Sequence, residues 1–252
     1  MTDPVVRMAT ALALALGAVP VQADEVLVAV AANFAAPMAR LAEAFTAATG
    51  HTLKLASGAT GKFYSQIVAG APFEVLLSAD ETTPRRLIAE GHAVAGSAFT
   101  YAVGQLVLWS ATPGLVDAQG AVLASGRFRK IAIASPKTAP YGRAAMEVLV
   151  ARGLEGPLSL KLVTSESVAQ AYQFVATGNA ELGFVALSQV SVPGKAPVGS
   201  MWRVPASLHA PMRQDAVLLK AGAGKPAAAA LLQWLRSEPA QAVIQSYGYA
   251  RG

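Results

Sequence analysis

Short uncharged apolar runs alternate along the chain with segments in which apolar residues recur at helical spacing. Residues 26–32 form such a run, and Met38, Leu41 and Phe45 follow at the spacing of one helix face, up to Gly50. This pattern predicts a strand buried on both faces, followed by a helix. The later predicted strands cover residues 52–55, 75–78, 101–109, 131–134, 160–163, 182–185 and 216–219. The later predicted helices cover residues 63–68, 84–90, 141–152, 168–177, 226–235 and 239–245.

Alternation of this kind predicts the α/β class, with parallel sheets covered by helices. A turn-rich segment around Pro113 and Gly120 separates two such series. We therefore predict two α/β lobes, one made of residues 24–102 with 216–252 and the other of residues 103–215. Two crossing strands would join them as a hinge, with a ligand cleft between the lobes.

The first residues have the pattern of an export signal. Arg7 precedes an apolar run over residues 9–19, and Val21-Gln22-Ala23 follows Pro20. The run is shorter than the roughly 20 apolar residues that a membrane span needs, and no later stretch supplies them. We predict a signal peptide over residues 1–23, cleaved after Ala23, and a mature protein that is soluble and periplasmic.

Composition narrows the chemistry. The 252 residues include no cysteine and three histidines, His51, His92 and His209, which are far apart. Disulfides, thiolate nucleophiles, zinc-thiolate sites, iron–sulfur clusters and a helical two-histidine metal site are therefore excluded. The formal net charge of +5 favours an anionic ligand. Because Lys and Arg are scattered, the pattern does not indicate a nucleic-acid surface.

Four polar or small-residue segments lie between a predicted strand and a helix. They cover residues 31–34, 57–62, 135–142 and 165–168, two in each lobe. Helix capping or a tight turn explains each one separately. Together they offer backbone N–H groups, the Thr60 and Tyr141 hydroxyls and positive helix ends, which suit a small oxyanion in a shared cleft.

Other functions remain to be weighed. The loop at residues 57–62 is not a nucleotide-binding P-loop, because Ala56 and Phe63 stand where that motif needs Gly and Ser or Thr. The chain has no GxSxG motif, yet a hydrolase with dispersed Ser, His and Asp residues stays open. A passive structural or adhesive module is disfavoured, because donor-rich loops recur in both lobes.

Several ordered motifs together resemble one family. They are Val30-Ala31-Ala32-Asn33-Phe34, the loop at residues 57–61, residues 66–72, Leu77-Ser78-Ala79-Asp80, Ala139-Pro140-Tyr141-Gly142 and residues 182–186. With these motifs the chain resembles the periplasmic molybdate-binding proteins of ABC importers, the ModA family. The resemblance extends over residues 24–252. It implies a type II periplasmic-binding-protein fold that holds a tetrahedral dianion between the lobes.

The resemblance also implies the ligand residues. These are Ala32, Asn33, Thr60, Tyr141 and Val168, with Ser57 as a less certain neighbour. Ala32 lacks the hydroxyl that relatives can have at this position. Ala186 stands where one branch of the family has a ligand-binding Tyr, so Tyr141 would supply that donor here.

The implied function is capture of molybdate, and of tungstate, for delivery to an ABC transporter permease. The protein would be a monomer without a cofactor, a catalytic role or a metal site of its own. A donor-only pocket disfavours phosphate, which carries a proton near neutral pH. Sulfate lacks that proton but is smaller, so another tetrahedral oxyanion remains the alternative ligand.

Overall fold

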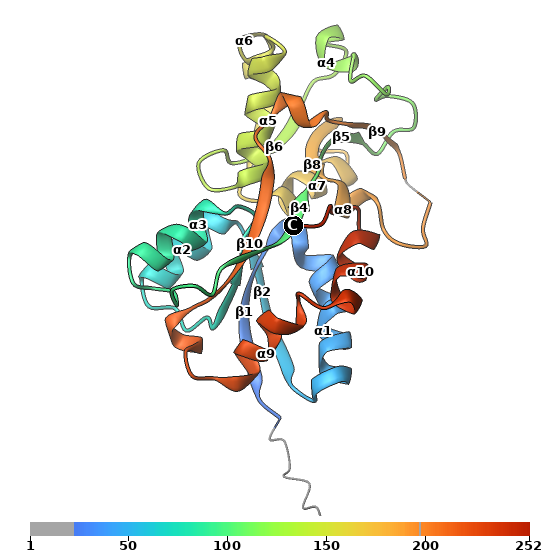
Figure 1. The fold of residues 1–252 in the computed structure, drawn as a ribbon. Coiled ribbons are helices and arrows are strands. Elements are labelled where there is room, and N and C mark those ends of the chain that lie inside the picture. Colours follow the sequence, from blue (N-terminus) through green and yellow to red (C-terminus); the bar gives the residue numbers. More distant parts are fainter. Residues whose placement is uncertain (1–22, 197) are drawn as a thin grey trace, which may run out of the picture.

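The chain folds into two α/β lobes, each built on a five-stranded sheet (Figure 1). A computed structural model describes residues 23–196 and 198–252. The prediction of two α/β lobes is confirmed. The predicted export signal lies outside the described residues, except for Ala23.

The first sheet has the strand order β2-β1-β3-β10-β4. Its strands are β1 (Glu25–Ala31), β2 (Thr52–Gly58), β3 (Val75–Leu77), β4 (Phe99–Gly104) and β10 (Met212–Leu218). β1 is parallel to β2 and β3, as predicted, but β10 runs antiparallel to β3 and β4, so the sheet is mixed. The helices of this lobe are η1 (Ala32–Phe34), α1 (Ala35–Thr49), α2 (Thr60–Val68), α3 (Thr82–Ala89), η4 (Lys220–Gly222), α9 (Pro226–Trp234) and α10 (Glu238–Ser246).

The second sheet has the order β7-β6-β8-β5-β9 and is also mixed. Its strands are β5 (Leu106–Ser110), β6 (Ile131–Ala134), β7 (Leu162–Ser165), β8 (Leu182–Ala186) and β9 (Ser200–Arg203). The helices of this lobe are α4 (Val122–Ser125), α5 (Pro140–Ala151), α6 (Glu155–Leu158), η2 (Ser159–Lys161), α7 (Val168–Ala176), α8 (Leu187–Val190) and η3 (Ala206–Leu208).

Two predicted crossing elements differ from the structure. The single strand predicted over residues 101–109 is two strands, since β4 ends at Gly104 in the first sheet and β5 begins at Leu106 in the second. The returning strand, β10, begins at Met212 rather than at Ala216. Met212 pairs with Gly104, so the two crossings lie side by side (Figure 1).

Local sequence signals set the ends of the helices that matter for the site. α1 ends at Gly50, whose φ of 78° is in the left-handed region that glycine adopts without strain. α5 begins with Pro140, which has no N–H to leave unpaired in the first turn. The Ser167 hydroxyl accepts a hydrogen bond from the N–H of Gln170 and so caps α7.

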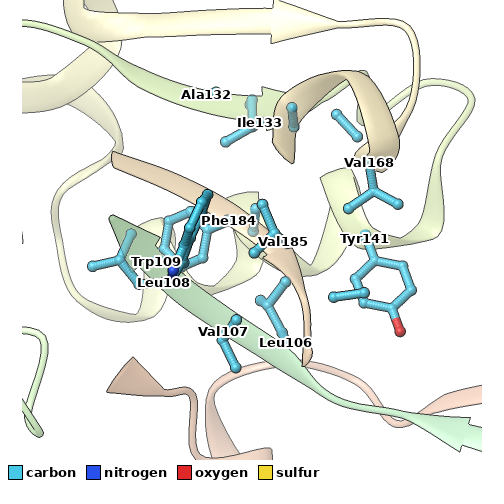
Figure 2. Close-up of a cluster of buried hydrophobic side chains, with 14 of the residues drawn as sticks. Leu106, Val107, Leu108, Trp109, Ala132, Ile133, Tyr141, Val168, Phe184 and Val185 are labelled. Atoms are coloured by element: carbon cyan, nitrogen blue, oxygen red, sulfur yellow. The ribbon is translucent and has the colours of Figure 1, made fainter. Parts of the chain in front are cut away.

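The largest apolar cluster belongs to the second lobe and reaches across to the first. Around the second sheet it includes Leu106, Phe184 and Val185, which Figure 2 shows together with Tyr141 and Val168. The same cluster contains four alanines of the first lobe, namely Ala31, Ala32, Ala59 and Ala79. The facing ends of the two lobes are therefore in apolar contact, and the protein is in a closed conformation.

Candidate functional site

A small pocket lies where the two lobes meet. Its lining comes from the ends of strands and the starts of helices in both lobes, and comprises Ala31, Ala32, Asn33, Gly58, Ala59, Thr60, Ala79, Ala139, Pro140, Tyr141 and Val168. The cavity volume there is about 10 Å³. A cavity of roughly 10–15 Å³ holds one water molecule, so in this closed state the pocket has room only for a very small ligand.

The structure brings together five residues that the sequence predicted. Ala32, Asn33, Thr60, Tyr141 and Val168 all line this pocket. Each is buried, with no more than 7% of its surface exposed. Little of the pocket lining is therefore in contact with solvent.

Helix starts converge on the pocket from both sides. Thr60 and Val168 are the first residues of α2 and α7, and Tyr141 is the second residue of α5. Ala32 begins the short helix η1. The first N–H groups of a helix have no partner within it, and the helix dipole is positive at that end. The arrangement favours an anion.

The pocket lining contains no charged side chain. Among the described residues, no group of three or more His, Asp or Glu side chains is placed to hold a metal ion. Backbone N–H groups and hydroxyls are therefore the chemistry that the lining offers. Such groups bind an anion by donating hydrogen bonds to it.

Thr60 is held in a position to donate. Its Oγ1 accepts a hydrogen bond from the N–H of Ala79, at 3.0 Å, in the loop that follows β3. Because the backbone amide uses a lone pair of the hydroxyl oxygen, the Thr60 proton remains for another acceptor. The contact also fixes α2 against the neighbouring strand end.

Tyr141 keeps its proton. Burial, together with the neighbouring Tyr249 hydroxyl, holds the pKa of Tyr141 well above its ordinary value. In Figure 2 its ring lies beside Val168 at one end of the apolar cluster, with the hydroxyl directed away from these side chains. The hydroxyl oxygen accepts a hydrogen bond from Nε2 of Gln214, at 3.2 Å. Tyr141 is thus a neutral hydroxyl attached to the lobe through an apolar ring.

The Asn33 side chain is committed to a buried polar network. Its Nδ2 donates to Oε1 of Gln214 and to the Tyr249 hydroxyl, both at 2.9 Å. Its backbone oxygen accepts from Tyr249 and from Ser188 of the second lobe, both at 2.8 Å. The side chain of Asn33 therefore connects η1 to β10 and to Tyr249.

Polar contacts close the rim of the pocket. The N–H of Gly61 donates to the Thr138 oxygen at 2.9 Å, and Lys62 forms an ion pair with Glu166 at 2.6 Å. On another side, Arg143 of α5 forms an ion pair with Asp80 at 2.8 Å. Each of these contacts joins one lobe to the other.

Ser57 is not part of the pocket lining. It lines a neighbouring groove with Lys62, Glu166 and Ser167. The reason is that β2 continues to Gly58, so Ser57 is a strand residue rather than part of a loop before the helix. The sequence analysis also missed Gln214, Tyr249 and Ser188, which support the pocket from distant parts of the chain.

Comparison with known proteins agrees with this arrangement. The family model described as "Bacterial extracellular solute-binding protein" matches residues 26–250. The molybdate-binding protein ModA of Azotobacter vinelandii is 58% identical over 243 residues, 96% of each chain. ModA of Rhodobacter capsulatus is 54% identical over 242 residues, 96% of this chain and 94% of its own.

The chain belongs to the bacterial extracellular solute-binding protein family, and within it to the ModA proteins. The solved structure of the periplasmic molybdate-binding protein of Azotobacter vinelandii has a TM-score of 0.88 and 44% identity, covering 90% of this chain and 99% of its own. The substrate-binding domain of a molybdenum ABC transporter protein from Clostridium difficile has a TM-score of 0.67 and 26% identity, over 91% and 100%. The predicted ModA resemblance is confirmed.

Proposed function

We propose that this ModA-family chain is a periplasmic solute-binding protein that captures molybdate, and tungstate, and delivers it to an ABC transporter. The observation that carries this proposal is the uncharged, buried pocket at which helix starts of both lobes meet. A dianion is stable in such a place only where its oxygens accept many hydrogen bonds, and the donors in the lining are the N–H groups of the helix starts and the hydroxyls of Thr60 and Tyr141. The names of the two ModA relatives reported above agree with this ligand.

Each proposed ligand residue has a defined role. Ala32, Asn33 and Val168 would donate their backbone N–H groups, Thr60 would donate both its N–H and its hydroxyl, and Tyr141 its hydroxyl. Loss of one such donor is expected to cost about 1–3 kcal/mol of binding free energy. Ser57 stays a secondary candidate, because its groove adjoins the pocket.

Selectivity would follow from the donor set and the pocket size. Hydrogen phosphate has a proton that needs an acceptor, and the pocket lining contains no carboxylate that could accept it. Sulfate has no such proton, so cavity size would distinguish it from the larger molybdate. Tungstate matches molybdate closely in size and charge, and is expected to bind as well.

The remaining parts of the proposal concern location, partner and catalysis. The leader at residues 1–23 would be cleaved after Ala23, which places the mature chain in the periplasm. In the described parts of the chain, no helix combines the length and apolar character of a membrane span. We propose a monomer that performs no covalent chemistry and contacts a membrane permease with the rims of its lobes.

The lobes would work as a clamp. We propose a first lobe of residues 24–104 with 212–252 and a second of residues 105–211, which moves the boundaries predicted from the sequence by two to four residues. The pairing of Gly104 with Met212 in the first sheet and the start of β5 at Leu106 in the second support these boundaries. Ligand would bind between open lobes, and the closed shape would be the form that the transporter recognises.

Thermal unfolding of the mature protein tests this function. Bound ions are first removed by partial unfolding and dialysis, and molybdate, tungstate, sulfate or phosphate is then added at matched ionic strength. A ligand at 100 times its dissociation constant adds about 2.7 kcal/mol of stability. We expect upward shifts with molybdate and tungstate alone. A shift with sulfate instead would keep the oxyanion site but change the ligand, and no shift with any anion would contradict the proposal.

A further inference from the structure

A β-bulge in the hinge region places one buried glutamine beside the pocket. In the pairing of β10 with β4, Gln214 lies opposite Ala102, while Asp215 lies opposite Thr100. Tyr101 therefore has no residue opposite it, and the register of the two strands shifts there. Bulges near functional sites redirect side chains, and here the redirected region includes Gln214, which is fully buried.

Three hydrogen bonds fix the orientation of the Gln214 amide. Its Oε1 accepts from Asn33 Nδ2, at 2.9 Å, and from the Tyr101 hydroxyl, at 3.1 Å. Because two donors face Oε1, the Nε2 end is the one that points at Tyr141, to which it donates at 3.2 Å. Gln214 thus presents a donor, and not an acceptor, to the Tyr141 hydroxyl.

This orientation determines what the Tyr141 hydroxyl can do. The oxygen already accepts from Gln214, so its single proton is left for another acceptor, either the neighbouring Tyr249 hydroxyl or a bound anion. Tyr141 lines the pocket, where a bound oxyanion supplies acceptors. If Oε1 of Gln214 faced Tyr141 instead, it would accept the hydrogen bond of the Tyr141 hydroxyl. A lone pair of the hydroxyl oxygen would then face the anion.

The hinge strand leaves room for this contact. A Cβ at Gly104 would collide with both the Tyr141 hydroxyl and, at 2.5 Å, Nε2 of Gln214. Gly104 is the last residue of β4, next to the crossing into the second lobe. The pair of side chains thus meets directly over the hinge, and one partner comes from each lobe.

We propose that Gln214 is a positioning residue that commits the Tyr141 hydroxyl to donate its hydrogen bond to the bound oxyanion. The inference rests on the proposed function, since it takes Tyr141 as a ligand residue. Because Gln214 lies on a hinge strand of the first lobe and Tyr141 on α5 of the second, the contact that orients the hydroxyl forms as the lobes close.

A double-mutant cycle separates this role from a structural one. The Gln214→Glu variant keeps an acceptor for Asn33 and Tyr101 and replaces only the donor that faces Tyr141. Gln214→Met removes both the acceptor and the donor and has a side chain of similar length. Each is combined with Tyr141→Phe, and molybdate affinity is measured by calorimetry. Gln241→Met is the matched control, because Gln241 is a buried glutamine that bonds only backbone oxygens, those of Tyr101 and Leu235.

We expect that substitution of Gln214 removes most of the effect of Tyr141→Phe on molybdate affinity. Tyr141→Phe should raise the dissociation constant about tenfold in the wild-type and Gln241→Met backgrounds, and less than about twofold in both Gln214 backgrounds. The charge of Gln214→Glu acts on the anion whether or not Tyr141 is present, so the cycle cancels it. Far-UV circular dichroism and melting temperature establish that each variant is folded.

Two results would overturn the inference, and they have different meanings. If Tyr141→Phe costs the same factor in all backgrounds, Gln214 is structural and the proposed function stands. If Tyr141→Phe has no effect in the wild-type background, or the wild type does not bind molybdate, the proposed site fails and the role of Gln214 fails with it.

Discussion

The backbone N–H of Gly61 donates to the carbonyl oxygen of Thr138 across the mouth of the pocket, at 2.9 Å. Gly61 belongs to α2 of the first lobe, and Thr138 to the loop before α5 of the second. A Cβ at Gly61 would lie 3.0 Å from both Cα and O of Thr138. The lobes therefore meet at backbone distance, and a side chain at position 61 would push the two backbones apart.

Gly61→Ala is accordingly expected to separate two effects. Alanine favours the helix by roughly 1 kcal/mol, so thermal stability without ligand should stay the same or rise. Closure should be hindered, with a loss of about 1–3 kcal/mol of molybdate binding free energy. Calorimetry and thermal unfolding measure the two quantities. Gly156→Ala is the control, because nothing lies within 4 Å of its added Cβ, and it should leave affinity unchanged. Equal affinity of Gly61→Ala and wild type would show that closure does not bring these backbones together.

Thr60 should contribute to both stability and binding. Thr60→Ala leaves the buried N–H of Ala79 without its acceptor and removes one donor from the pocket. We expect a loss of about 1–3 kcal/mol in each of unfolding and binding free energy, measured by urea denaturation and calorimetry. Thr60→Ser keeps the hydroxyl and should remain close to wild type. A Thr60→Ala variant that loses stability but binds molybdate normally would remove Thr60 from the ligand set.

The contribution of Tyr141 should not depend on pH in the alkaline range. A tyrosine with an ordinary pKa is half ionised near pH 10, and an ionised oxygen cannot donate. Burial raises the pKa of Tyr141 well above that value, so its proton stays in place as the pH rises through 10. The ratio of dissociation constants of Tyr141→Phe and wild type, measured from pH 8 to 10, should therefore be constant. A ratio that falls toward one near pH 10 would mean that the hydroxyl ionises normally.

The ion pairs Lys62–Glu166 and Arg143–Asp80 should differ in how strongly they slow the release of molybdate. Lys62 and Glu166 are exposed over 48% and 72% of their side chains, whereas Asp80, the partner of Arg143, is exposed over only 13%. Water screens the first pair more, so Lys62→Gln should change molybdate release by less than about fivefold, which corresponds to 1 kcal/mol. Arg143→Gln should accelerate release more than Lys62→Gln does. Stopped-flow measurement, with an excess of a second molybdate-binding protein to trap the released ion, gives the release rate of each variant. Faster release from Lys62→Gln than from Arg143→Gln would show that burial does not control the strength of these ion pairs.

Much of the fold could be read from the sequence, because buried parallel strands are continuous apolar runs and each helix that follows has an apolar face. The strands that were not predicted correctly differ from the prediction for specific reasons. A single residue, Gln105, separates β4 from β5, so no turn signal marks the change of sheet. In β10 the polar segment Arg213-Gln214-Asp215 follows Met212 and does not have the pattern of a buried strand, although Gln214 and Asp215 are buried. β9 lies among Pro and Gly residues that indicate a loop.

The candidate site also has a part that the sequence predicts and a part that it does not. The four strand–helix segments were predictable, since the carboxyl ends of the strands, where helices begin, collect ligands in α/β folds, and the resemblance to the ModA family then indicated the five residues within them. The supporting network was not, because its bonds join Asn33 to Gln214 and Tyr249, 181 and 216 residues further along the chain. No local pattern marks such contacts. Only the folded first lobe shows that these side chains share one hydrogen-bonded cluster.

The central claim is that one molybdate ion lies between the lobes, held by neutral donors. A crystal of the mature protein with molybdate, measured on both sides of the molybdenum absorption edge, locates the metal atom directly. The account predicts one strong anomalous peak enclosed by Ala32, Asn33, Thr60, Tyr141 and Val168, with oxygens at hydrogen-bond distance from the backbone N–H groups of α2 and α7. A peak on the surface, or in the groove that Ser57 lines, would contradict it.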